Sequence, residues 1–208
     1  MECIIYPFRH ADTILNRPEF IDQYNELMGI IRDVTEDDLI YRHKGYLESD
    51  MDKAPKSLSV AINEILKERF VAKGWQEESY IFQDNKYRGE TWRLDFAKKD
   101  ISLEVAFNHS TVIAWNLIKP VLASELNHVN KEIQTKIGVI ITITNDLKKS
   151  GGFDSAVGTY EKFLDHLAPL QNLLTVPLLI IGLKAPKTFK IGMVQLEKRK
   201  KVGSIQFL

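Results

Sequence analysis

The sequence predicts an α/β layered domain, in which a mixed central β-sheet is flanked by helices. Three observations lead to this prediction. Apolar residues recur at helical spacing near the N-terminus, an alternating hairpin follows near residue 100, and two short apolar runs then alternate with helical stretches. A chain of 208 residues suits one such domain.

Two helices are expected in the first third of the chain. The first begins near Pro18, which suits a first helical turn, and its apolar residues follow at helical spacing: Phe20, Ile21, Tyr24, Leu27, Met28 and Ile31. A polar loop is expected over roughly 33–57. The second helix is expected to start at Ser57 or Ser59 as its cap and to end at Gly74.

Extended segments are expected next, at about 78–83, 91–97 and 101–107. WRLDFA and ISLEVAF alternate apolar and polar residues, so the AKKD sequence between them predicts a hairpin turn. A helix is expected over 110–134, with Pro120 as a break or kink because proline has no N–H to donate.

Two buried strands complete the predicted sheet. KIGVIITIT and VPLLIIGL are almost wholly apolar, as strands covered on both faces are. Between them, the sequence predicts a polar loop (NDLKKSGGFDS) and a helix at about 157–172. The C-terminal tail, 184–208, predicts one or two edge strands.

Composition favours a soluble protein of the reduced cytoplasm. Cys3 is the one cysteine, so an intramolecular disulfide is excluded. The N-terminus has no secretory pattern, and no apolar run approaches the roughly 20 residues that cross a membrane. The phosphate-loop, dinucleotide and serine-hydrolase motifs are absent, so no nucleotide cofactor is expected.

Charge is balanced overall but uneven along the chain. There are 28 Lys and Arg against 28 Asp and Glu, and this zero net charge taken alone argues against a nucleic-acid partner. Residues 1–60, however, carry 7 basic and 12 acidic residues, whereas residues 184–201 carry seven basic residues against Glu197. The basic tail is either a solvated face or a source of phosphate contacts.

Two carboxylates are expected to meet across the predicted hairpin. Asp95 lies on its first arm and Glu104 on its second, between Leu103 and Val105. A carboxylate within an apolar strand is costly unless it is paired or binds a metal, and two of them can hold Mg²⁺. Such a metal supports phosphodiester hydrolysis. The alternative is that Glu104 is an exposed edge-strand residue and Asp95 a turn partner.

The sequence LDFAKKDISLEVAF resembles the active-site hairpin of PD-(D/E)XK nucleases, in the form found in BglII- and BstYI-type restriction endonucleases. In that form an aspartate is followed nine positions later by a glutamate in an E-V-x-F setting. Three more segments are similar, in the same order: HADTILN at 10–16, SVAINEILKERFVAKGW at 59–75, and the IGVIITIT strand with its following loop and helix near 159–161. The resemblance covers about residues 10–183 and implies a restriction-endonuclease-like core.

The resemblance implies that Asp95 and Glu104 bind Mg²⁺. The third motif position is Lys in most members and Gln in the BglII type, whereas this chain has Ala106. The nearest residue able to compensate is Asn108, two positions further on. Glu68, on the preceding helix, is a candidate supporting acid, although Glu64 and Glu68 also suit a solvated helix surface.

Residues expected to contact DNA lie after the hairpin and in the loop over about 145–159. His109 follows the catalytic strand, where the family places a base-contacting residue, although a surface histidine packed on the sheet is an equal alternative. Base contacts are expected from Asp154, Ser155 and Thr159, and phosphate contacts from Lys148 and Lys149.

The function expected from this resemblance is that of a type II restriction endonuclease. It would be a Mg²⁺-dependent homodimer that cuts both strands of a short palindromic double-stranded DNA site and leaves 5′ overhangs. A homodimer is expected because a twofold axis matches a palindrome. Two alternatives stay open: a catalytically silent DNA-binding protein on the same fold, suggested by Ala106, and a repair-type nuclease.

Overall fold

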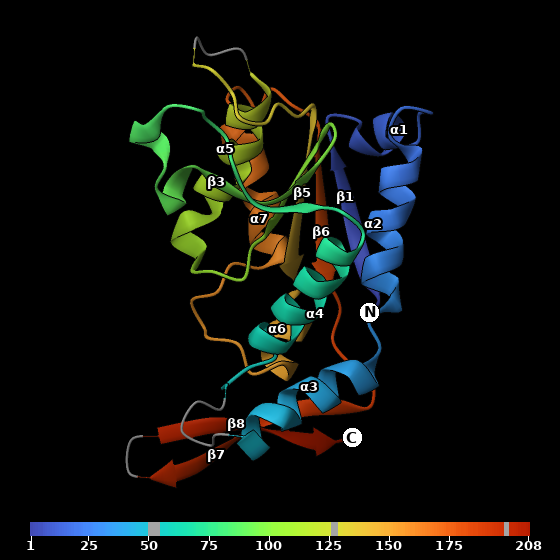
Figure 1. The fold of residues 1–208 in the computed structure, drawn as a ribbon. Helices are drawn as coiled ribbons and strands as arrows, with labels where there is room; N and C mark the ends of the chain where they lie inside the picture. Colours follow the sequence, from blue (N-terminus) through green and yellow to red (C-terminus); the bar gives the residue numbers. More distant parts are fainter. Residues whose placement is uncertain (50–54, 126–128, 198–199) are drawn as a thin grey trace.

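A six-stranded mixed β-sheet is the centre of the computed structural model, which describes residues 1–49, 55–125, 129–197 and 200–208 (Figure 1). Its strands lie in the order β1-β6-β5-β4-β3-β2. They are β1 (Cys3–Phe8), β2 (Gln76–Tyr80), β3 (Arg93–Lys98), β4 (Ile101–Val105), β5 (Ile137–Ile143) and β6 (Leu178–Leu183). The α/β fold with a mixed sheet is thus confirmed.

Strand direction explains the composition of the central strands. β4, β5 and β6 are parallel to one another, and β1, β3 and β2 extend the sheet by antiparallel pairing. Every residue of β5 and of β6 is buried, because helices cover both faces of these strands. The two apolar runs of the sequence are therefore the two innermost parallel strands, as predicted.

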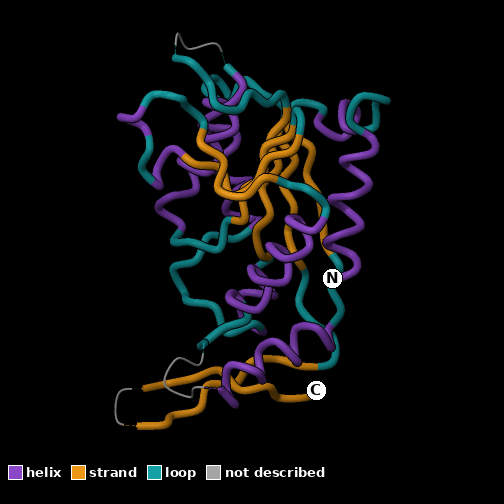
Figure 2. Tube along the Cα trace, viewed as in Figure 1, coloured by secondary structure: helices purple, strands orange, loops and turns teal. Residues whose placement is uncertain are grey.

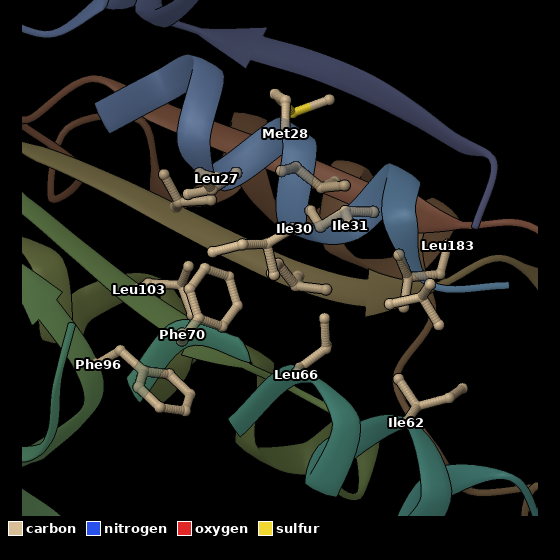
Figure 3. Close-up of a cluster of buried hydrophobic side chains, with 14 of the residues drawn as sticks. Leu27, Met28, Ile30, Ile31, Ile62, Leu66, Phe70, Phe96, Leu103 and Leu183 are labelled. Carbon is tan, nitrogen blue, oxygen red and sulfur yellow. The ribbon is translucent and has the colours of Figure 1, made fainter. Parts of the chain in front are cut away.

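Helices form the outer layers. They are α1 (Ala11–Leu15), α2 (Ile21–Asp33), α3 (Glu36–Ser49), α4 (Ser59–Ala72), α5 (Ile113–Ser124), α6 (Asn145–Ser150) and α7 (Tyr160–Leu170). The core between the sheet and helices α2 and α4 includes Leu27, Leu66, Phe70 and Leu103 (Figure 3). A second core, which contains Leu117, Ile140 and Phe163, lies between the opposite face and helices α5 and α7.

Helix α5 is seated closely on this second face. Pro120, inside the helix, is buried against β5, where a Cβ added to Gly138 would lie 2.4 Å from the Pro120 Cβ. Only glycine at position 138 therefore leaves room for the proline ring. Because Lys119 directly precedes Pro120, this contact also sets the distance between Lys119 and the sheet.

Several predicted boundaries are wrong. The expected polar loop at 33–57 contains α3, which begins with three acidic residues that stabilise a helix N-terminus. The helix expected over 110–134 is only α5, because the chain turns extended at Glu125. The polar loop after β5 contains α6, capped by Thr144, and strand β1 had not been predicted.

The C-terminal tail forms a separate two-stranded sheet instead of joining the edge of the main sheet. β7 (Phe189–Glu197) pairs with β8 (Lys200–Phe207), and the pair lies against α3 (Figure 2). His43 of α3 is fully buried there, with Nε2 3.0 Å from the Gly203 carbonyl oxygen. Lys198 and Arg199 of the basic tail lie outside the described residues.

Across the described part of the chain, none of the helices has the length and apolar character needed to cross a membrane.

Candidate active site

The hairpin β3–β4 brings Asp95 and Glu104 together. The strands pair Phe96 with Leu103 and Ala97 with Ser102, so the next step of the register places Asp95 opposite Glu104. The Asp95 backbone N–H donates to Glu104 Oε1 at 3.3 Å, and the Val105 N–H donates to Asp95 Oδ2 at 2.7 Å. Strand pairing alone therefore sets the relative position of the two carboxylates.

A lysine from helix α5 completes this cluster. Lys119 Nζ donates to Glu104 Oε2 at 2.5 Å, and both residues are buried, with exposed fractions of 8% and 2%. Glu104 faces α5 because side chains alternate along β4, with Leu103 directed to the opposite core. Two acids and one base thus meet between the sheet and the helix.

Burial makes the two carboxylates hard to ionise together. Desolvation, followed by the nearby Asp95 charge, raises the pKa of Glu104 to about 8, although Lys119 opposes the shift. Desolvation also raises the pKa of Asp95, against a hydrogen bond from Val105 and the attraction of Lys119. A further cation near these acids would relieve both costs.

The donor set fits a divalent ion such as Mg²⁺. Mg²⁺ binds oxygen ligands and keeps several waters, so one or two carboxylates with substrate phosphate suffice for it. Asp95 and Glu104 supply two carboxylates against a single buried lysine. Among the described residues, no group of three or more His, Cys, Asp or Glu side chains is placed to hold a metal.

Ala106, at the third motif position, contributes no charged side chain to the site. Ala106 is buried and belongs to the core beneath α5, with Ile113 and Leu117. Asn108 lies beyond the end of β4 and is exposed, and its carbonyl oxygen accepts from the Gly158 N–H at 2.9 Å. Its backbone thus joins the strand end to the loop before α7.

The prediction that Glu68 supports the metal site is wrong for this structure. Glu68 is more than half exposed and pairs with Arg42 of α3 at 2.7 and 2.6 Å. It lies on α4, which packs against the face of the sheet opposite to α5 and the Glu104 side chain. The solvated helix surface is therefore the correct interpretation for Glu68, and Glu64 contacts the same arginine.

The loop after β4 and the loop before α7 lie side by side. His109 forms an isolated bridge with Val157, and the Ser110 N–H donates to the Ala156 carbonyl at 2.8 Å. His109 is exposed, with Nδ1 2.9 Å from Thr111 Oγ1, and Asp154 and Ser155 are exposed too. Three of the residues expected to contact DNA are therefore on adjoining loops.

The other three residues expected to contact DNA behave differently. Thr159 is fully buried, so the prediction that it contacts DNA is wrong for this conformation. Lys148 Nζ donates to the Ser155 carbonyl at 2.5 Å, which braces the loop, and burial lowers its pKa. Lys149 is exposed on α6.

Comparison with known proteins gives the class of this protein, a nuclease with the restriction-endonuclease fold. The family model described as restriction endonuclease BglII/BglIII matches residues 3–183. The chain therefore belongs to the BglII/BglIII restriction endonuclease family, whose members are type II site-specific deoxyribonucleases.

Solved structures agree on the fold. Restriction endonuclease BglII complexed with a DNA 16-mer is similar with a TM-score of 0.67 and 21% identity, and both chains are covered completely. Free BglII is similar with a TM-score of 0.55 and 20% identity, again over the whole of both chains. No curated protein matches the sequence.

Lys119 is the site residue that sequence reasoning missed. A signal for it was present: the segment IAWNLIKPVLAS is apolar apart from two polar side chains and one charge, that of Lys119. A charge alone within a buried helix needs a partner, because an unpaired buried ammonium is costly.

Proposed function

We propose that this protein uses Mg²⁺ to hydrolyse both strands of a short palindromic site in double-stranded DNA. The observation that supports this most strongly is the Asp95–Glu104 pair, opposed across a hairpin in a chain of the BglII/BglIII family. When bound, a divalent ion supplies an activated water and stabilises charge on the phosphate. Residues 1–208 act as one nuclease domain.

The two carboxylates share one task in this proposal. Asp95 and Glu104 hold the ion, and the backbone bonds from Val105 and Asp95 fix the direction of their oxygens. Because both acids lie on one strand pair, their spacing does not depend on a mobile loop. The sheet thereby preorganises the site, which is how positioned groups lower a reaction barrier.

DNA is proposed to contact the adjoining loops that carry His109, Asp154 and Ser155. These exposed polar side chains suit base edges, whereas Lys149 suits a phosphate. The DNA 16-mer in the similar BglII structure supports a DNA partner. A homodimer places two sites about a twofold axis, so that both strands are cut. The resemblance to the BglII type implies that the cuts leave 5′ overhangs.

The test is incubation of the purified chain with plasmid DNA and Mg²⁺, followed by run-off sequencing of the products. We expect double-strand cuts at one short palindrome and a dimer by sedimentation. Duplex binding in Ca²⁺ without cutting in Mg²⁺ would instead identify a silent DNA-binding protein, the reading that Ala106 suggests. Cleavage governed by DNA damage or branching would identify a repair-type nuclease.

A further inference from the structure

Lys119 stands out among the charged side chains of the molecule. Of all residues whose burial the structure gives, Lys119 and Glu104 are the only Lys, Arg, Asp or Glu side chains in the buried class. Within the described chain, Glu104 is the one protein group that accepts a hydrogen bond from Lys119. An ammonium has three N–H donors, so two remain for a ligand.

Stability does not explain a lysine at this place. Replacing a buried ion pair by apolar side chains of similar volume is often neutral or stabilising. Most neighbouring helix positions are apolar, with Leu117 and Val121 in the core, although Asn116 one turn earlier is polar and buried. A methionine would continue the apolar part of that surface. The charge is therefore there for another reason than holding α5 on the sheet.

The position of Lys119 suits the reacting phosphate. Its Nζ lies 2.5 Å from one oxygen of Glu104, whose other oxygen faces the backbone of Asp95. Asp95 keeps part of its surface exposed, so a ligand can reach the cluster from that side. A phosphate close to both carboxylates would need a cation beside it, and Ala106 has no charge to offer.

We propose that Lys119 is a catalytic residue whose ammonium group binds the scissile phosphate and stabilises the negative charge that develops on it. In the reaction, a bond forms between the oxygen of water and phosphorus, and the bond from phosphorus to the leaving sugar oxygen breaks. The attacking water loses a proton to solvent, and the leaving oxygen takes one up. Lys119 takes no part in these proton transfers. This inference rests on the proposed nuclease function.

The test compares Lys119→Met with Lys119→Arg in two measurements, single-turnover DNA cleavage and Mg²⁺ affinity by calorimetry without DNA. Lys119→Met should cut at least about 100-fold more slowly, as when one preorganised donor to a reacting oxyanion is removed. Its Mg²⁺ affinity should stay equal or rise several-fold, because a positive charge beside the two acids is gone. Lys119→Arg should recover part of the rate.

The matched control is Lys136→Met, since Lys136 also pairs with an acid, Asp100 at 3.2 Å, but is largely exposed. It should leave both measurements unchanged. Should Lys119→Met not fold, Lys119→Gln replaces it, because glutamine keeps a donor for Glu104 without a charge.

Two results would overturn the proposal. Cleavage by Lys119→Met within threefold of the parent rate would show that the charge is not used. Parallel loss of cleavage and Mg²⁺ affinity would show that Lys119 only holds Glu104. If the unmodified protein cuts no DNA, the proposed function is refuted, and so is the inference that rests on it. A parent that cuts, with a variant that cuts equally well, fails the inference alone.

Discussion

Two clusters in this molecule have the same make-up, two acids and one base, and differ in where they lie. Asp95, Glu104 and Lys119 meet between the sheet and α5, where Glu104 is 2% exposed. Glu64, Glu68 and Arg42 meet between α3 and α4, where the Glu68 side chain is 58% exposed.

The pKa of the glutamate shifts in opposite directions in the two clusters. Burial raises the pKa of Glu104 to about 8 despite its lysine, whereas the Arg42 hydrogen bonds lower the pKa of the exposed Glu68. In water an ion pair has little to gain or lose, but in the interior an unbalanced charge attracts a counter-ion strongly. Location, rather than composition, makes one cluster a candidate metal site and the other a surface contact.

Glu104→Gln should show the largest effect. The change keeps the side-chain volume and removes the negative charge, so we expect DNA cleavage to fall at least about a thousandfold and Mg²⁺ affinity to fall with it. Plasmid cleavage and calorimetry measure the two effects. The matched control is Glu68→Gln, and a Glu104→Gln protein that cuts as fast as that control would refute the site.

Gly138→Ala should disrupt the packing of α5 on strand β5. The added Cβ would lie 2.4 Å from the Pro120 Cβ and 2.6 Å from Leu178 Cδ2, so the helix must move away from β5. We expect a loss of about 2 kcal/mol in the free energy of unfolding, measured by denaturant titration, and slower cleavage because Lys119 moves too. Gly45→Ala in α3 is the control.

Gly45 has nothing within 4 Å of an added Cβ and lies inside a helix, so alanine there should stabilise by about 0.5–1 kcal/mol. Equal losses of stability in the two variants would contradict the close packing of α5.

His43 gives a smaller, pH-dependent test on the α3 side. Burial lowers the pKa of His43, so the unfolded chain binds a proton near pH 6.5 while the folded chain does not. The free energy of unfolding should therefore fall as the pH drops below 6.5, by up to about 2 kcal/mol at pH 5. His43→Gln should reduce this dependence, and an unchanged pH profile would speak against the buried neutral histidine.

Glu68→Gln should have the smallest effect. Exposed ion pairs contribute little, so we expect less than about 1 kcal/mol in the free energy of unfolding and no change in cleavage. Thermal unfolding and plasmid cleavage measure both. Loss of cleavage in Glu68→Gln would show that Glu68 belongs to the active site, and the contrast between the two clusters would then be wrong.

The sequence showed the acids of the site more clearly than its base. Asp95 and Glu104 lie on two neighbouring strands that are joined by a short turn, and both strands alternate apolar and polar residues. Local geometry is therefore enough to predict that the two carboxylates lie close together. Lys119 is 15 residues from Glu104, and only the packing of α5 brings it there. Local spacing cannot give such a contact, because it depends on where a helix crosses the sheet.

Helices and strands were likewise predicted where the local sequence pattern determines them and missed where tertiary contacts do. β5 and β6 were predicted because strands buried on both faces are apolar throughout. Helix α3 was missed because its apolar pattern is weak and its first turn is acidic, and Thr159 looked exposed because a polar residue in a loop usually is. In both cases tertiary contacts decided the outcome.

The parallel pairing of β4 with β5 has a consequence for folding order. Parallel neighbours need a crossover connection, and α5 is the helix of that crossover. The hairpin β3–β4 closes over a short stretch of chain, whereas Lys119 arrives only when the crossover docks. During synthesis at the ribosome, the two acids are therefore made before their lysine, and a chain that ends before residue 113 leaves them exposed to water.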